Sequence, residues 1–360
     1  MRRSAALFAC TTSAVLLAAA PAALAAPAHS ARPAHPARPA HTARPAAVAR
    51  APKDGAAAPV VAVIAELGKS SELMVRQGSL SAKWVDEYKP ADSHSASVAT
   101  DSKHGPLIAL VTNNGDVLAK EGSLTAKWSH VYTGRNAEYV AVASDPVHGP
   151  LIVVETLKGK VLAKEGTLSA PWVTEYSGAL HIAAASDAKH GPLVGIVTHS
   201  AKILVREGSL SAAWHDEYNG AQTIALASDT KHGPLIATIV DKTTELLVKQ
   251  GSLRAAWYPE HANVGSVAVA SDPVHGALIT AVLWRPEHVL GNLLAKDGAL
   301  SATWHLEHTL VGDASAASDP VYGPMIGLET YTPKDYVKLG KLSASWVHEW
   351  NASFLVQVAD

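Results

Sequence analysis

The stretch VLAKEGTLSAPWVTEY, residues 161–176, is written seven times in this sequence with small changes. The other copies are VRQGSLSAKWVDEY (75–88), LAKEGSLTAKWSHVY (118–132), VREGSLSAAWHDEY (205–218), VKQGSLRAAWYPEH (248–261), AKDGALSATWHLEH (295–308) and VKLGKLSASWVHEW (337–350). Their tryptophans are spaced by 44, 44, 42, 43, 47 and 42 residues. The chain is therefore built from a repeated unit of near-constant length.

A second motif follows the same period. It reads TDSKHGPLI, SDPVHGPLI, SDAKHGPLV, SDTKHGPLI, SDPVHGALI and SDPVYGPMI, with aspartates at Asp101, Asp145, Asp187, Asp229, Asp272 and Asp319. A period near 43 residues is typical of a propeller blade or of a helical-pair solenoid. Each unit holds four short apolar runs between turn residues, in the third unit EYVAVAS, PLIVVET, KVLAKE and PWVTEY. Such runs favour strands, so we expect an all-β fold, a β-propeller of four-stranded blades.

The two ends of the repeat region complement each other. The first unit begins at Pro59 with a run that aligns with the second strand of the other units, so it lacks an inner strand. The last residues, SFLVQVAD (353–360), resemble an inner strand ending in the repeated aspartate. We expect seven blades over residues 59–360, with the first blade closed by the C-terminal strand, which would leave no free sheet edge.

The turns divide between two faces of the expected disc. The SDxxHG turn and the EGSLSAxW turn both lie on one face, which we call the repeated face. The opposite face, the variable face, carries turns that differ between units, such as NNGD (113–116) and WRPEHVLGN (284–292).

The first 58 residues have a different composition. Residues 1–25 read as a signal peptide, with Arg2 and Arg3 before an apolar run and Ala23-Leu24-Ala25 as the cleavage site. We interpret Cys10, the only cysteine, as part of this discarded segment; the alternative is a lipobox. Residues 26–58 are rich in Ala, Pro, Arg and His, which predicts a disordered linker. The mature protein is thus expected to be secreted and free of disulfides.

Charge separates the linker from the repeats. The linker carries a net charge of +4, so it is either a spacer or a tail that touches anionic polymers. From residue 60 onward the chain has 23 basic and 31 acidic residues. An acidic body argues against nucleic-acid binding, and no later apolar stretch is long enough for membrane insertion.

The aspartate and histidine of the SDxxHG turn have two interpretations. A strand-end carboxylate can accept hydrogen bonds from turn amides and orient an imidazole, which would be structural. Alternatively the pair binds sugar hydroxyls or a metal. Tyr322 replaces the histidine in one unit, which argues against a metal ligand. The histidines are His104, His148, His190, His232 and His275.

The repeated tryptophan also has two interpretations. It either fills the gap to the neighbouring blade or offers a stacking platform for a sugar ring. Glutamate follows three residues later in six copies, and Val131 breaks the series. Alternation along a strand predicts that the tryptophan and the residue four positions later share a face. The tryptophans are Trp84, Trp128, Trp172, Trp214, Trp257, Trp304 and Trp346, and the tyrosines four residues later are Tyr88, Tyr132, Tyr176 and Tyr218.

Other motifs carry little chemistry. The basic residue two positions before the motif glycine is lysine in five copies and arginine in two, which is typical of a solvated strand edge. The sequence has no G-x-S-x-G, no H-E-x-x-H and no phosphate-binding loop, so we expect neither an enzyme, nor a cofactor, nor a metal site.

The KEGSLSAxWVxEY unit and its sevenfold repetition resemble secreted bacterial β-propeller lectins of the tectonin and tachylectin type. That resemblance implies sugar pockets between adjacent blades. Our first hypothesis is a multivalent lectin for glycans or cell-wall polysaccharide, with weak equivalent sites that use the tryptophans, tyrosines and histidines named above. The alternative is a protein-interaction scaffold in a secreted complex that uses the variable face. Binding valency would separate the two hypotheses.

Overall fold

The computed structural model describes residues 58–67, 70–88, 93–285, 288–332, 334–351 and 353–359. All of them belong to one compact unit, residues 49–360. The predicted signal peptide and nearly all of the predicted linker lie outside the described residues. The described residues form strands and turns, and no membrane-crossing helix is found among them. The expectation of an all-β fold is therefore confirmed for this part of the chain.

The strands form antiparallel sheets in which chain order equals spatial order, with one exception at the termini. The first sheets of four strands are β4 (Ser93–Asp101), β5 (Gly105–Thr112), β6 (Val117–Glu121), β7 (Ser129–Tyr132); and β8 (Ala137–Asp145), β9 (Gly149–Thr156), β10 (Lys160–Glu165), β11 (Val173–Ser177). The next are β12 (Ala179–Asp187), β13 (Gly191–Thr198), β14 (Lys202–Glu207), β15 (His215–Asn219); and β16 (Ala225–Asp229), β17 (Gly233–Ile239), β18 (Leu246–Gln250), β19 (Tyr258–His261).

A larger sheet follows, with seven strands. Its members are β20 (Val264–Asp272), β21 (Gly276–Arg285), β22 (His288–Gly298), β23 (His305–Asp319), β24 (Gly323–Thr330), β25 (Lys334–Leu339) and β26 (Val347–Asn351). The first part of β23 pairs with β22 and its second part pairs with β24. The long strand β23 is therefore the outer strand of one four-stranded set and the inner strand of the next.

The exception in chain order joins the two ends of the repeat region. In the last sheet the order is β27 (Ser353–Ala359), β1 (Val60–Leu67), β2 (Ser70–Gln77) and β3 (Val85–Tyr88). Strand β27 pairs antiparallel with β1, and Val60 lies opposite Ala359. Strand β27 also contacts the inner strands β23 and β4.

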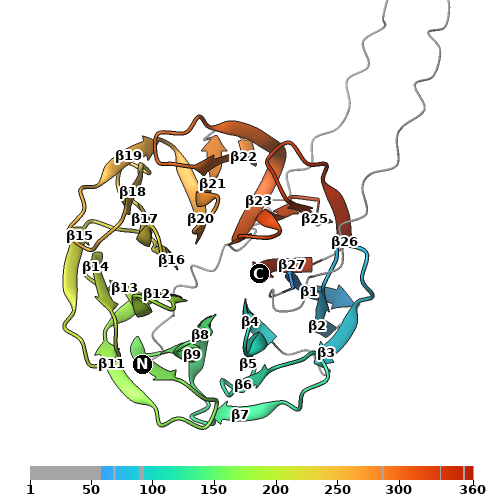
Figure 1. Ribbon diagram of the computed structural model, residues 1–360, viewed down its shortest axis with the longest axis vertical. Helices are drawn as coiled ribbons and strands as arrows, with labels where there is room; N and C mark the ends of the chain where they lie inside the picture. Colours follow the sequence, from blue (N-terminus) through green and yellow to red (C-terminus); the bar gives the residue numbers. More distant parts are fainter. Residues whose placement is uncertain are drawn as a thin grey trace, which may run out of the picture. The chain divides into compact units, whose positions relative to one another are not determined.

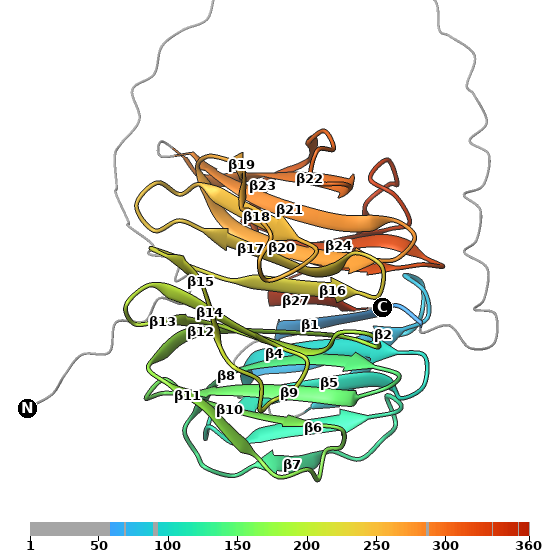
Figure 2. The ribbon, with the colours of Figure 1, turned by 60° about the vertical axis from the view of Figure 1, so that its left-hand side comes forward.

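The sheets are arranged radially, with the first strand of each nearest the centre (Figure 1). Figure 2 shows that neighbouring sheets lie face to face, so both faces of a middle strand are covered. This explains why β9 is buried along its whole length and reads as a continuous apolar run rather than an alternating one. Radial four-stranded antiparallel sheets are the architecture of a β-propeller.

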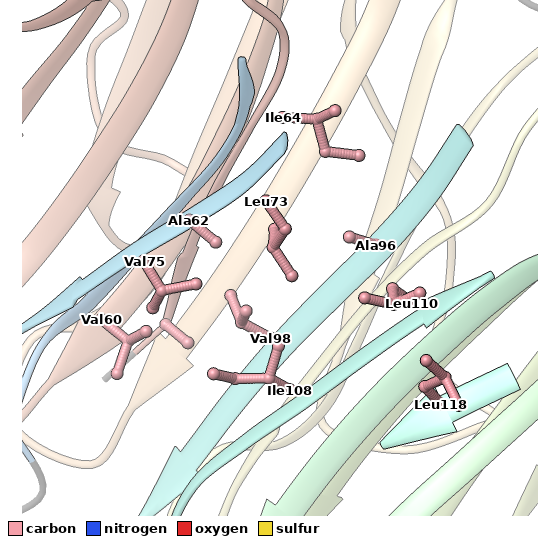
Figure 3. Packing of buried hydrophobic residues seen from close by; sticks show 11 residues of the cluster. Val60, Ala62, Ile64, Leu73, Val75, Ala96, Val98, Ile108, Leu110 and Leu118 are labelled. Atoms are coloured by element: carbon pink, nitrogen blue, oxygen red, sulfur yellow. The ribbon is translucent and has the colours of Figure 1, made fainter. Parts of the chain in front are cut away.

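Apolar clusters fill the space between neighbouring sheets. Figure 3 shows one, in which Val60, Ile64 and Leu73 of one sheet meet side chains from β4 to β6 of the next. These side chains are almost completely buried. Burial of such aliphatic side chains contributes about 1.5–3 kcal/mol each, so the contacts between sheets are the main source of stability.

The two repeated turns touch each other on the same face. Gly233 ends the SDxxHG turn with φ +73°, and a Cβ there would lie 2.7 Å from the backbone oxygen of Gly251 in the neighbouring turn. Gly233 is needed because the two backbones approach this closely, and Gly251 because its φ is +104°. The prediction that these two turns share one face is confirmed.

Candidate functional site: the seams between neighbouring sheets

Each repeated motif contributes to two seams, where a seam is the boundary between neighbouring sheets. We name a seam by the outer strand of one sheet and the third strand of the next. The seams are β3/β6, β7/β10, β11/β14, β15/β18, β19/β22, β23/β25 and β26/β2.

A β-bulge in the outer strand decides which side chains enter a seam. In β7, Tyr132 pairs with Val117 and His130 pairs with Leu118, so Val131 is an extra residue. The same shift occurs in the other outer strands. A bulge interrupts the alternation of side chains. As a result, the residues three and four positions after the tryptophan both face the following sheet.

The prediction that the tryptophan and the residue four positions later share one face is therefore wrong. Trp172 does not pack against Tyr176 but against Tyr132 of the preceding motif, at 5.9 Å between ring centroids. Tyr176 packs against Trp214. Simple alternation failed because the bulge adds one residue.

The repeated tryptophan occupies the same environment in every seam. Its ring is half-buried and lies edge-on to an aromatic residue or histidine of the preceding motif, with centroids 5.5–6.2 Å apart. The Nε1 group donates a hydrogen bond of 2.7–3.2 Å to a backbone oxygen of the preceding outer strand for Trp128, Trp172, Trp214, Trp257 and Trp346. These contacts match the packing interpretation, while direct stacking on a sugar stays a prediction.

The repeated cation covers the tryptophan and does not lie on a solvated edge. Lys120 and its equivalents lie 4.5–5.3 Å from the centre of the tryptophan ring of their own motif. Their amino or guanidinium groups pair with the glutamate of the preceding motif in six seams. The solvated-edge interpretation is wrong because the bulge turns the glutamate inward, where the pair is buried.

In three of these pairs, burial is the largest influence on the pKa of the acid. It raises the pKa of Glu87 and of Glu175, while the cation opposite each acid acts in the other direction. In the β26/β2 seam, burial raises the pKa of Glu349 to about 7, Arg76 opposes the rise and Asp335 adds to it. A buried ion pair recovers little net stability because both charges leave water.

The aspartate of the SDxxHG turn is saturated by hydrogen bonds. One carboxylate oxygen of Asp101 accepts from the amides of Lys103 and His104, and the other lies 3.0 Å from the Nδ1 of His104. The hydroxyl of Ser144, on the next inner strand, also donates to this carboxylate. The pattern recurs at Asp145, Asp187, Asp229 and Asp272.

These bonds also fix the ionisation state of the aspartate. Burial acts to raise the pKa of Asp101, but the hydrogen bonds from Ser144, His104 and Lys103 together hold it below its usual value. The ionised carboxylate therefore ties one sheet to the next and orients the imidazole, as the structural interpretation requires. Among the described residues, no group of three or more His, Cys, Asp or Glu side chains is placed to hold a metal ion.

The repeated face is hollowed at the β19/β22 seam by a groove with a volume of about 520 Å³. The lining residues are His232, Gln250, Gly251, Tyr258, Pro259, Glu260, Leu300 and Ser301. The mixture of an exposed tyrosine, aliphatic carbon and a few polar groups is typical of a small-ligand site. The groove lies between neighbouring sheets, at the turns that repeat.

Buried polar atoms without a hydrogen-bond partner also indicate a binding site at this groove. The Nε2 atom of Gln250 is buried and has no hydrogen-bond partner among the described residues. Glu121 and Asp297 hold the equivalent position before the motif glycine in two other units, and each has one buried oxygen of the same kind. Buried polar groups normally have partners, so these atoms are suited to bind hydroxyl groups of a ligand.

Some of the residues predicted to bind sugar line the groove, and others do not. His232 lines it, whereas Trp257 and Trp304 lie beside the seam and are absent from its lining. Gln250 and Tyr258 were not predicted as ligands. The sequence did offer one indication for Gln250, because six copies have an acid or an amide directly before the motif glycine.

The variable face has a different character. Trp284 is 55 % exposed, and Leu310 and Tyr331 are also exposed. The equivalent turn positions of other units hold Asn113, Leu157, His199 and Asp241, of which Leu157 is also an exposed apolar side chain. Residues 286 and 287 of the predicted loop 284–292 lie outside the described residues; the flanking residues belong to β21 and β22.

Comparison with known proteins supports the fold. No family model matches the chain, and no curated protein matches it. Among solved structures, the BP39L lectin from Burkholderia pseudomallei superposes with a TM-score of 0.61 at 10% identity, over 83% of this chain and 96% of that one. The SapL1 lectin in complex with alpha methyl fucoside gives a TM-score of 0.50 at 13% identity, over 72% and 96%.

An enzyme shares the same architecture. The tricorn protease superposes with a TM-score of 0.50 at 12% identity, over 83% of this chain and 36% of that one. At these identities the likeness shows a β-propeller fold alone, since one fold hosts unrelated functions.

Proposed function

We propose that this protein is a carbohydrate-binding propeller, a lectin without enzymatic activity, with several equivalent sites in the seams of the repeated face. The observation that carries the proposal is the groove of about 520 Å³ at the β19/β22 seam, with an unpartnered amide atom on Gln250. The two lectins among the similar folds support it. We further propose that the chain is secreted after removal of residues 1–25.

The proposal includes a ring of seven four-stranded blades. The division of β23 between two four-stranded sets supports this count. The pairing of β27 with β1, and its contacts with β23 and β4, support closure of the first blade by the C-terminal strand. In such a ring each seam presents nearly the same backbone, and a polymeric ligand meets several sites at once.

At the β19/β22 seam the lining residues divide the contacts with a sugar between them. Tyr258 and Leu300 offer carbon surface to one side of a sugar ring, while His232, Gln250 and Ser301 bind its hydroxyl groups. The half-buried tryptophan beside each seam fixes the wall of the groove. Single sites of this size bind weakly, with Kd of about 1 mM, and several engaged on one polysaccharide gain about 10²–10⁴ in avidity.

Titration calorimetry with alpha methyl fucoside, the ligand of SapL1, tests the proposal. The mature protein is expected to bind several equivalents per chain with one affinity. His232→Ala combined with Gln250→Ala removes one equivalent and leaves the affinity of the rest unchanged, because separated sites act independently. A glycan array extends the search to other sugars, and no binding to any glycan would refute the proposal.

A second candidate function rests on the variable face. The exposed side chains of Trp284, Leu310 and Tyr331 are suited to a protein partner in a secreted complex, since exposed aromatic residues often anchor interfaces. In that case Trp284→Ala would abolish capture of one protein per chain and leave glycan binding unaffected.

A further inference from the structure

One seam lacks the buried acid that the other six contain. At the β7/β10 seam the position of the glutamate is held by Val131. The backbone is nevertheless placed as in the other seams: Trp172 Nε1 donates to the backbone oxygen of Val131 at 2.7 Å, and Tyr132 lies edge-on to Trp172. This seam therefore lacks the acid, but its tryptophan makes the same contacts as in the other seams.

The cation of this seam remains in place without its acid. The Lys164 side chain keeps the position over Trp172, with Nζ 4.6 Å from the ring centre, and the residue is 4% exposed. Its Nζ donates to the backbone oxygen of Leu168 at 2.8 Å, and no carboxylate pairs with it among the described residues. Burial lowers the pKa of Lys164. An unpaired buried cation is costly, so an added anion gains strongly from meeting it.

The groove at the β19/β22 seam shows that the acid position of a seam is accessible from the repeated face. Glu260, the acid that pairs with Lys296, is itself part of the groove lining. By the repeat, the corresponding wall at the β7/β10 seam consists of Val131, Leu168, His104 and Glu121. A group that enters there approaches Lys164 from the side on which the other seams hold a carboxylate.

We infer that the β7/β10 seam binds the carboxylate of an acidic sugar, a uronate, which takes the place of the missing glutamate and pairs with Lys164. The inference rests on the proposed function for the sugar ring, while the selectivity for the anion comes from Val131 and Lys164 alone. Glu121 is the acid that belongs to this wall. Burial raises the pKa of Glu121, with Asp101 adding to the rise and His104 opposing it, and a higher pKa weakens its repulsion of a bound anion.

Two matched pairs of probes test the inference: methyl glucuronide against methyl glucoside, and methyl galacturonide against methyl galactoside. Each pair differs only in the carboxylate. For at least one pair, calorimetry with the mature protein is expected to show one uronate per chain bound about tenfold or more tighter than the neutral glycoside. Val131→Glu restores the internal acid and is expected to abolish this preference. Uronate binding that survives Val131→Glu, or no preference in either pair, overturns the inference.

A gain-of-site variant gives an independent readout. Glu260→Val copies the β7/β10 arrangement into the seam whose groove is open, and it is expected to raise uronate stoichiometry from one to two. Should this variant fail to fold, the Val131→Glu comparison decides alone. A protein that binds neutral sugars but no uronate refutes only the inference. A protein that binds one uronate sensitive to Val131→Glu, but no neutral sugar at any seam, refutes only the equivalent sites of the proposed function.

Discussion

The β3/β6 and β7/β10 seams differ at the buried acid position and agree in the contacts of their tryptophans. In the first, Lys120 pairs with Glu87; in the second, Val131 holds the position of the glutamate and Lys164 Nζ donates to the backbone oxygen of Leu168. Both seams keep the tryptophan bond to the preceding outer strand, at 2.8 Å and 2.7 Å, and the edge-on aromatic contact at 6.0 Å and 5.9 Å. The ion pair is therefore not required to set the geometry of a seam.

The comparison shows which interactions position neighbouring sheets. Trp128 and Trp172 fill a gap, satisfy their only donor and meet a tyrosine edge, all independently of charge. Buried ion pairs are weak determinants of stability, because desolvation of both charges offsets their attraction. The charges at a seam are consequently free to differ between repeats, and a difference there can serve ligand selection.

The largest expected effect comes from removing the inner strand of one sheet. Deletion of residues 353–360 removes β27, exposes the edge of β1 and uncovers the apolar cluster that contains Val356 and Val358. The free energy of unfolding is expected to fall by more than about 5 kcal/mol, measured by urea denaturation. Deletion of residues 26–58 is the control and is expected to leave stability nearly unchanged. An unaltered denaturation curve for the first variant would refute closure by the C-terminal strand.

The sequence predicted the architecture because strand length, turn residues and a constant period are local properties. The four runs of the third unit, from EYVAVAS to PWVTEY, correspond to β8, β9, β10 and β11. The contacts of Trp172 were not predictable in the same way. A single bulged residue, Val131, reverses the side on which Tyr132 lies, and no residue type marks that bulge.

The next largest effect tests the comparison of the two seams directly, with one substitution in each. Lys120→Met leaves Glu87 buried without a partner and is expected to destabilise the protein by about 3–5 kcal/mol. Lys164→Met removes a buried cation that has no acid, so it is expected to be neutral or to stabilise by about 1 kcal/mol. Thermal unfolding of both variants measures the difference. Equal losses in the two seams would show that the cation acts through packing on tryptophan.

A smaller effect depends on pH and involves Glu155, which stands where the preceding sheet has Val111. Burial raises the pKa of Glu155 to about 7, and Glu138 adds to the rise. Because the folded pKa lies above the usual 4.5, the protonated acid is favoured by folding. Its stabilising contribution is full below about pH 4.5 and is lost as the pH rises through 7.

Glu155→Gln is therefore expected to stabilise the protein at pH 8 by up to about 3 kcal/mol and to change little at pH 4. Urea denaturation of both proteins at several pH values measures this. A difference that is independent of pH would refute the assigned titration. Val111→Ile at the equivalent position of β5 is a control without a titrating group.

The groove itself was only partly predictable. Its histidine came from the SDxxHG motif, which the sequence marks clearly. Gln250 and Tyr258 come from different motif positions, and only the packing of one sheet on the next brings them together. The inward orientation of the motif glutamate could not be predicted from the sequence either, since it follows from the bulge.

The smallest expected effect concerns the serine that joins one inner strand to the next. Ser144 donates to Asp101, and serines at the equivalent position serve four further seams. At the C-terminal strand that position is Ala359, so Asp319 accepts from the amides of Val321 and Tyr322 without a serine from β27. Ala359→Ser is expected to stabilise the protein by about 0.5–1.5 kcal/mol by adding the missing hydrogen bond, and Ser144→Ala to destabilise it by a similar amount.

Ala359 is buried, so the new hydroxyl is costly unless it donates a hydrogen bond to the carboxylate of Asp319. The double variant Ala359→Ser with Asp319→Asn separates the two cases by thermal unfolding. If the serine stabilises equally with and without that carboxylate, the assignment of Asp319 as its acceptor is wrong, and the terminal seam differs from the others in more than one missing hydroxyl.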